Sequence, residues 1–280
     1  MKIIECPRDA MQGVVEFIPT KKKIDYINQL LKIGFDTIDF GSFVSPKVIP
    51  QLKDTAQVLD SLDLTKTSSK LLSIIANIRG ANQACGYNQI DYLGFPLSVS
   101  EEFQKRNTNK SISQAINIVE EIKNLSLKHD KELVVYLSMA FGNPYDELYH
   151  PDIVAGLTEK LNKLGVQTIA LSDTIGVSEP NNIAPLFSLL INEYSNIEFG
   201  AHFHTTSDTC KEKIDAAYKN GCNRFDSALK GYGGCPMAED ELVGNMPTEQ
   251  LIRYFGDQLD FNYSAFSESF KFLDQIFLKK

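Results

Sequence analysis

Two histidines separated by one residue, His202 and His204, carry the strongest chemical signal in the sequence. They are two of only four histidines in the chain, and they end a short apolar run that predicts a β-strand. Alternate side chains of a strand point to the same side, so both imidazoles would project from one face in a chelating arrangement. Imidazole is a common metal ligand, yet histidines also pack in cores through hydrogen bonds. Taken alone, the pair fits a metal or catalytic site and a core pair equally well.

Other polar residues could complete such a site. Arg8 and Asp9 follow the first predicted strand, Asp39 ends the second, Asp173 ends the sixth, and Asn245 lies in the polar segment after the eighth. Considered singly, Asp9 is more typical of a turn or a helix cap, and Arg8 of a solvated charge. These residues indicate a functional site only if the fold brings them together.

The segment Gly231-Tyr232-Gly233-Gly234-Cys235-Pro236 is the second unusual feature. Its glycines allow backbone conformations that other residues avoid, and they place one thiol on a loop rather than in the core. A thiol beside a metal can act as an acid or a base, so we expect Cys235 to be functional. The other four cysteines are expected to be buried or incidental.

The elements that would position these residues alternate regularly between predicted strands and predicted helices. Eight short apolar runs predict strands, and between them apolar residues recur at helical spacing, as at Ile112, Ala115 and Val119. Pro151 fits the first turn of a helix, and Pro7, Arg8 and Asp9 are expected in a loop. The predicted strands are Lys2–Cys6, Asp36–Phe40, Leu71–Ala76, Gln89–Gly94, Glu132–Leu137, Thr168–Ser172, Ile197–His202 and Asn223–Asp226.

This alternation predicts an α/β fold, a single TIM (β/α)8 barrel, because eight βα units are typical of a closed parallel barrel and an open doubly wound sheet usually has fewer strands. An open flavodoxin-like sheet is the alternative. No linker or repeat divides the chain, so we expect one domain over residues 1–280, with 258–280 as a C-terminal helical extension. In a barrel, strand eight neighbours strand one, and chemistry sits at the carboxyl ends of the strands. Asp9, the histidine pair and the last polar loop would then meet on one arc of the rim.

Composition excludes several other classes of protein. The formal net charge is −8 and the basic residues are scattered, which argues against a nucleic-acid surface. No apolar run is long enough to cross a membrane, and no targeting leader is visible. Five widely spaced cysteines do not resemble a disulfide framework, which favours a reducing, cytoplasmic location.

The ligand types narrow the choice of metal without settling it. Two imidazoles and a carboxylate, completed by an amide oxygen such as that of Asn245, suit Mg²⁺ or Mn²⁺. Iron or zinc would also accept these ligand types.

Several motifs together closely resemble the 3-hydroxy-3-methylglutaryl-CoA lyases, a branch of the barrel family that also holds isopropylmalate and homocitrate synthases. The resemblance extends from the first strand to about Glu249. The motifs are Pro7-Arg8-Asp9-Ala10-Met11-Gln12, Ser42-Phe43-Val44-Ser45-Pro46-Lys47, Ser172-Asp173-Thr174-Ile175-Gly176, His202-Phe203-His204 and Gly233-Gly234-Cys235-Pro236.

The resemblance implies cleavage of 3-hydroxy-3-methylglutaryl-CoA to acetyl-CoA and acetoacetate, chemistry of the leucine-degradation and ketone-body type, by a homodimer. By position, Asp9, His202, His204 and Asn245 would bind the divalent cation. Arg8 would stand beside the developing enolate, Asp173 and Cys235 would exchange protons, and Asp39 would replace a common glutamate near the reacting groups. Gln12 and Asn107 would contact the acyl-CoA substrate.

This chain also departs from the family pattern. Ala10-Met11 stands where Gly-Leu is common, Asp39 where glutamate is common, and Thr205 where aspartate is common. The segment from Cys235 to Asn245 is one residue longer than usual. These departures concern substrate identity more than reaction type. A related 3-hydroxyacyl-CoA lyase or Claisen-type synthase is therefore the alternative, followed by a barrel that binds without catalysis.

Overall fold

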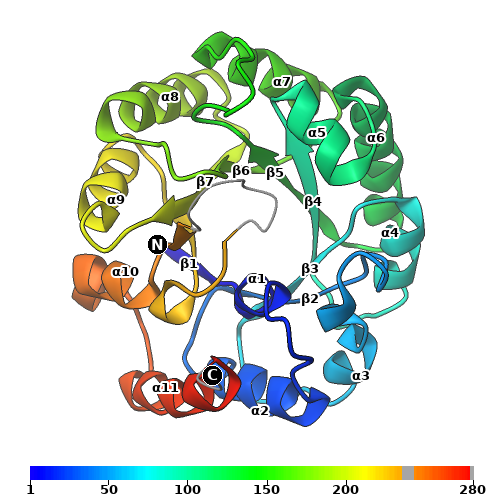
Figure 1. Cartoon of the computed structure of the whole chain (residues 1–280), viewed down its shortest axis with the longest axis vertical. Helices are drawn as coiled ribbons and strands as arrows, with labels where there is room; N and C mark the ends of the chain where they lie inside the picture. Colours follow the sequence, from blue (N-terminus) through cyan, green and yellow to red (C-terminus); the bar gives the residue numbers. More distant parts are fainter. Residues whose placement is uncertain (235–242, 278–280) are drawn as a thin grey trace.

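The chain folds into a closed parallel β-barrel surrounded by helices, as the alternation of elements predicts. The computed structural model describes residues 1–234 and 243–277. Among these residues each of the first eight strands pairs in parallel with the next, and β8 pairs with β1 to close the ring (Figure 1). The strands are β1 (Lys2–Glu5), β2 (Thr37–Ser42), β3 (Lys70–Ile74), β4 (Tyr92–Ser98), β5 (Glu132–Ser138), β6 (Thr168–Asp173), β7 (Glu198–Thr205) and β8 (Arg224–Ser227).

Helices form the outer layer, most of them between consecutive strands. The helices are α1 (Pro7–Gln12), α2 (Thr20–Leu30), α3 (Thr55–Leu59), α4 (Ile78–Cys85), α5 (Glu101–Thr108), α6 (Ile112–Lys128), α7 (Pro151–Lys163), α8 (Pro180–Glu193), α9 (Cys210–Lys219), α10 (Thr248–Phe255) and α11 (Tyr263–Phe277). Pro151 begins α7, as expected. Ser111 and Gln114 form a capping box at the start of α6, which satisfies backbone N–H groups that lack helical partners.

The strands separate two apolar regions. Inside the barrel, Leu72, Tyr92, Val134 and Tyr136 belong to a small buried cluster. Alternate side chains point outward and form the larger core beneath the helices. Strands buried on both faces explain why runs such as that of β5 are mostly apolar instead of alternating with polar residues.

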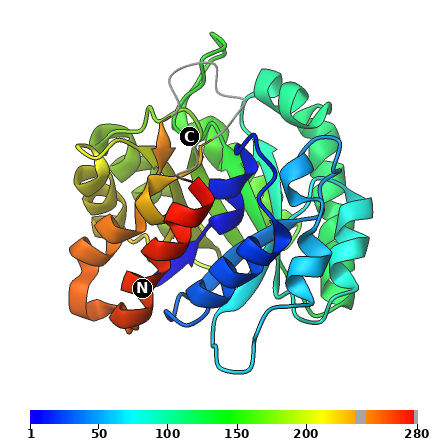
Figure 2. The ribbon, with the colours of Figure 1, turned by 60° about the horizontal axis from the view of Figure 1, so that its bottom comes forward.

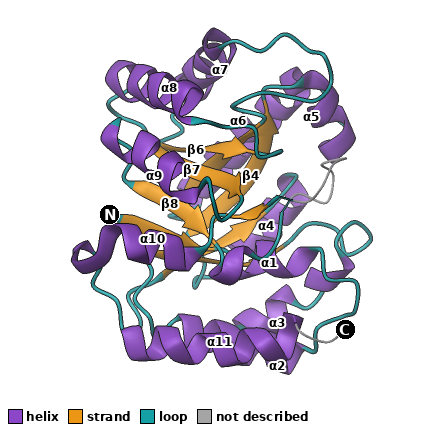
Figure 3. Ribbon diagram, turned by 60° about the vertical axis from the view of Figure 1, so that its left-hand side comes forward, coloured by secondary structure: helices purple, strands orange, loops and turns teal. Residues whose placement is uncertain are grey.

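The C-terminal helix α11 packs beside α2, at the outside of the barrel (Figures 2 and 3). The side-chain amide of Gln29 on α2 donates to the carbonyl of Ala265, and the rings of Phe35 and Phe261 meet edge to face with their centroids 5.0 Å apart. No helix within the described residues is both long and apolar enough to span a bilayer.

Three local predictions need correction. Pro7, Arg8 and Asp9 lie in helix α1 and not in a loop, since a proline in the first turn is compatible with a helix. Strand β4 begins at Tyr92, later than predicted, and Asp39 lies within β2 instead of at its end. A short strand, β9 (Gly244–Asn245), pairs antiparallel with β7 and was not predicted, because two residues carry too little pattern.

Candidate metal centre

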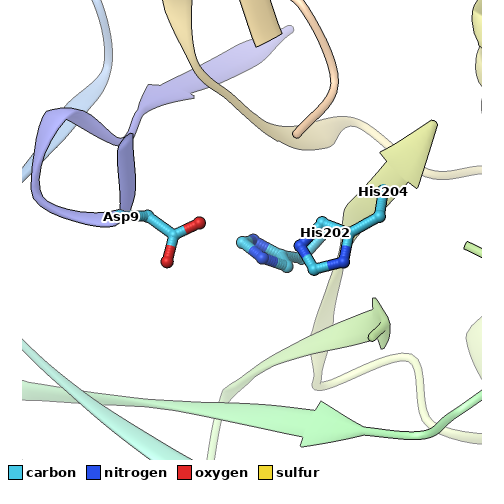
Figure 4. A group of neighbouring side chains, drawn as sticks. All are labelled: Asp9, His202 and His204. Atoms are coloured by element: carbon cyan, nitrogen blue, oxygen red, sulfur yellow. The ribbon is translucent and has the colours of Figure 1, made fainter. Parts of the chain in front are cut away.

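Asp9, His202 and His204 converge at the carboxyl ends of the barrel strands. Helix α1 carries Asp9 directly after β1, and β7 carries both histidines, whose rings project toward that carboxylate (Figure 4). One ligand atom from each of the three side chains lies within 4.8 Å of the others. The alternation of strand side chains thus produces the chelating arrangement that the sequence pattern indicated.

Hydrogen bonds leave one nitrogen of each imidazole available. Nδ1 of His204 is 2.9 Å from the carbonyl oxygen of Thr174, which can only accept, so Nδ1 must carry the proton. Nε2 of His204 is buried and has no partner among the described residues. Nδ1 of His202 lies 3.1 Å from Oδ2 of Asp226. A buried bare nitrogen beside a carboxylate needs a partner, and a cation would satisfy both.

Asp9 is held as an acceptor on both oxygens. Its Oδ1 accepts from Nη1 of Arg8 at 2.9 Å and from the side-chain amide of Gln12 at 2.5 Å, while its Oδ2 accepts from the side-chain amide of Asn245 at 2.6 Å. Burial opposes ionisation, but the charge of Arg8, assisted by the two histidines, lowers the pKa of Asp9. The carboxylate is therefore ionised and positioned for a cation.

Arg8 connects this carboxylate to a second one. Its Nε donates to Oδ2 of Asp39 at 2.9 Å and its Nη2 to the same oxygen at 2.5 Å. The other oxygen of Asp39 is buried and unpartnered within the described part of the chain. Burial raises the pKa of Asp39 to about 6, against the lowering effect of Arg8. Asp39 therefore fixes the guanidinium in place from within β2.

The segment after β8 approaches the centre through a glycine. Asn245 pairs with His204 across β9 and β7, and its amide nitrogen also donates to the carbonyl of Tyr232. Gly233 has φ +99°, and a Cβ there would lie 2.9 Å from the backbone oxygen of Asp9 and 2.5 Å from the amide nitrogen of Asn245. Only glycine allows this approach. Cys235, predicted to be functional, lies outside the described residues.

A cavity of about 450 Å³ opens over the centre. Arg8, Asp9 and the two histidines line it on one side, and apolar groups such as Ile74 and Pro96 on another. Gln12 and Asn107, the predicted substrate contacts, both line this cavity. Its size lies within the range of small-ligand sites.

Asp173 is not brought to the cavity. Its neighbours Ser172 and Thr174 line the cavity, so the alternation of β6 turns Asp173 to the opposite face. There its Oδ2 accepts from Nζ of Lys213 at 2.8 Å and from the hydroxyl of Ser178 at 2.5 Å. The expectation that Asp173 faces the same rim space therefore needs correction.

Lys213, Thr174 and Asp226 contribute to the centre although the sequence patterns did not single them out. Nζ of Lys213 forms a buried ion pair with Asp173 on β6 and also donates to the carbonyl of His204 on β7 at 2.8 Å. Lys213 therefore connects the ends of these two strands. A backbone acceptor such as that of Thr174 has no sequence signal. Asp226 had one, because it ends the eighth predicted strand beside the histidine strand.

Comparison with known proteins places this geometry in context. The family model described as HMGL-like matches residues 2–262. The chain is 33% identical over 256 residues to a hydroxymethylglutaryl-CoA lyase of Bacillus subtilis (strain 168), covering 91% of this chain and 84% of that protein. It is 32% identical over 255 residues to the 3-hydroxy-3-methylglutaryl-CoA lyase, cytoplasmic, of Rattus norvegicus, covering 90% of this chain and 73% of that protein.

A solved structure of an HMG-CoA lyase is also similar to this chain. The HMG-CoA lyase of Acinetobacter baumannii, determined in complex with coenzyme A and 3-methylmalate, superposes with a TM-score of 0.90 at 32% identity. The superposition covers 99% of this chain and 90% of that one. Its likeness therefore includes the whole barrel and the elements that carry the candidate centre.

Proposed function

Because the chain belongs to the HMGL-like family, we propose that it is a metal-dependent carbon–carbon lyase that cleaves 3-hydroxy-3-methylglutaryl-CoA to acetyl-CoA and acetoacetate. Similarity to lyases of that name over about nine-tenths of the chain supports the substrate. The observation that carries the mechanism is the buried Nε2 of His204, which has no partner among the described residues and lies beside the ionised Asp9.

The donor set fits a divalent cation. Asp9, His202 and His204 would hold it, and the amide oxygen of Asn245 would complete the set, since the amide nitrogen is already used toward Asp9. We propose Mg²⁺ or Mn²⁺, because oxygen ligands and open positions suit these ions. Such a cation, when bound, lowers the pKa of a coordinated hydroxyl and stabilises developing negative charge.

Cleavage requires the tertiary hydroxyl to lose its proton while the bond between C2 and C3 breaks. The electron pair of that bond forms the enolate of acetyl-CoA, which is then protonated at carbon. Arg8 lines the cavity and stays charged, because Asp39 and Asp9 raise its pKa against the effect of burial. We propose that this guanidinium stabilises the enolate oxygen.

We propose that Cys235 exchanges the proton: as a thiolate it would accept the proton of the tertiary hydroxyl, and as a thiol it would return that proton to the enolate carbon. The thiol would follow Gly233 and Gly234 on the segment that reaches Asp9. For Asp173, the contacts with Lys213 and Ser178 support a different proposal, in which it anchors the strand ends that carry His204 instead of exchanging protons.

Gln12 and Asn107 are proposed to contact the acyl-CoA substrate from two different helices, α1 and α5. We further propose one domain over residues 1–280, with 258–280 as the helical extension, working as a homodimer in the cytoplasm. Sedimentation analysis of the purified chain tests the dimer, and a monomer at micromolar concentration would contradict it.

A direct assay tests the activity. The purified chain with Mg²⁺ or Mn²⁺ should release acetoacetate from 3-hydroxy-3-methylglutaryl-CoA under reducing conditions, and a chelator should abolish the release. A panel of other 3-hydroxyacyl-CoA esters, and acetyl-CoA with keto acids, tests the related lyase and the Claisen-type synthase. Absence of any product would favour a barrel that binds without catalysis.

A histidine variant tests the ligand assignment. His202→Ala should lose metal-dependent turnover while remaining folded, since its ring lies at the rim of the barrel and not in the outer core. His129→Ala removes an exposed histidine on the outer surface and serves as the control. Full activity of His202→Ala would contradict the assignment.

A further inference from the structure

Asp226 is a buried carboxylate with no place in the mechanism described so far. It lies on β8 with its side chain 1% exposed, and its Oδ2 is 3.1 Å from Nδ1 of His202. The partner of the second ligand, His204, is the backbone carbonyl of Thr174 at 2.9 Å. The two histidines therefore have different kinds of acceptor at the same ring position.

Arg224 lies two residues earlier on the same strand and therefore on the same face. Its side chain is fully buried, and none of its three guanidinium nitrogens has a hydrogen-bond partner among residues 1–234 and 243–277. The nearest acidic group paired with it is Glu198, at 3.6 Å. Oδ1 of Asp226 is likewise unpartnered within those residues. Arg224 therefore places a buried positive charge on the same face of β8 as Asp226.

We infer that Asp226 is a positioning residue, which accepts the Nδ1 proton of His202 and so directs the Nε2 lone pair toward the cation. Arg224 supports this role through its buried positive charge on the same face of β8. The inference rests on the proposed metal-dependent function, because the cation gives the orientation its purpose. Partners on the far side of a ligating imidazole commonly fix the tautomer and the basicity of the ring.

An amide at this position should reverse the orientation. In Asp226→Asn the single amide oxygen is expected to turn toward the buried donors of Arg224, which make no hydrogen bond among the described residues and whose paired carboxylate, Glu198, is 3.6 Å away. The amide nitrogen would then face Nδ1 of His202 and force that nitrogen to accept. The proton would move to Nε2, where it blocks the lone pair that a cation needs.

Nitrogen-15 NMR of the imidazoles measures the tautomer without metal or substrate. Wild-type His202 should carry its proton on Nδ1 and show a bare Nε2, and Asp226→Asn should show the reverse. Electron paramagnetic resonance of free Mn²⁺ then gives affinity, which should fall about 10- to 100-fold in Asp226→Asn. A purely structural role for Asp226 would not change the tautomer.

Asp54→Asn is the matched control. The side chain of Asp54 is 8% exposed and pairs with Lys23 at 2.7 Å, and neither residue is among those that line the cavity. The same chemical change there should leave the His202 signals and Mn²⁺ affinity unchanged.

The outcomes separate the inference from the function on which it rests. A wild-type His202 protonated on Nε2 would overturn the inference, and this measurement does not require the variant to fold. Unchanged tautomer and affinity in Asp226→Asn would also overturn it. A wild-type protein with the expected tautomer that binds no Mn²⁺ would support the positioning role and contradict the proposed metal-dependent lyase.

Discussion

Replacing Glu5 by glutamine should stabilise the protein at alkaline pH and leave it nearly unchanged in acid. Glu5 lies on β1 and is fully buried. Its Oε1 accepts from the backbone N–H of Leu229 at 2.9 Å, and its Oε2 is 2.6 Å from the hydroxyl of Thr248. It thus connects β1 to both ends of the segment that carries Asn245. Burial raises the pKa of Glu5 from 4.5 to about 8, partly opposed by these hydrogen bonds.

The direction of the pH dependence follows from how the folded and unfolded states bind the Glu5 proton. The folded state holds the Glu5 proton up to about pH 8, whereas the unfolded state releases it near pH 4.5. The stability contributed by neutral Glu5 is therefore complete below pH 4.5 and lost as the pH rises toward 8. One pKa unit corresponds to about 1.4 kcal/mol, so ionisation costs up to about 4 kcal/mol between pH 5 and pH 8.5. Glutamine mimics the neutral acid, since its oxygen accepts from Leu229 and its nitrogen donates to Thr248.

Urea unfolding of both proteins between pH 5 and pH 9 provides the assay. The free energy of unfolding gained by Glu5→Gln should increase by about 2 kcal/mol or more between pH 5 and pH 9. This value is below the upper bound because the protein relaxes around the buried charge. Glu120→Gln makes the same change at an exposed position on α6 and should show no such growth. A gain that does not vary with pH, or a loss of stability at every pH, would refute the reasoning.

Three further results are expected. Gly233→Ala should weaken Mn²⁺ binding at least about 10-fold in a titration, because the added Cβ would meet backbone atoms of Asp9 and Ala10. Gly156→Ala is the control and should leave Mn²⁺ binding unchanged, because a Cβ there has no atom within 4 Å. Lys213→Met should lower the free energy of unfolding by about 3–5 kcal/mol in urea, since it leaves the buried carboxylate of Asp173 without its cation. A variant as stable as the wild type would show that this ion pair contributes nothing. Chelation should lower the melting temperature of the wild type, and an unchanged value would argue against a bound cation.

The sequence predicted the barrel because its signal is distributed over the whole chain. Eight apolar runs separated by helical patterns left few alternatives, and errors of a few residues, as at β4, did not alter the topology. The predicted positions of Asp9 and the histidines followed from that topology, since strand order alone places β1 and β7 on either side of β8.

Other features could not be predicted from the sequence, for physical reasons. The side chain of Asp173 points away from the cavity, which depends on the register of β6, and a shift of one residue reverses every side chain. The acceptor for His204 is the carbonyl of Thr174, which any residue would supply. The buried Lys213 resembled an ordinary charge on an amphipathic helix, because the sequence does not show which face of α9 packs against β7.

The same geometry has a consequence for how the protein is made. One proposed ligand lies on α1 near the start of the chain, and the others lie on β7 and β9, beyond residue 200. A chain emerging from the ribosome could not assemble the centre until β8 had closed against β1 and residue 245 had followed. Cation binding would then follow ring closure and stabilise only chains synthesised past residue 245, and the ion would connect parts of the barrel that are made early and late.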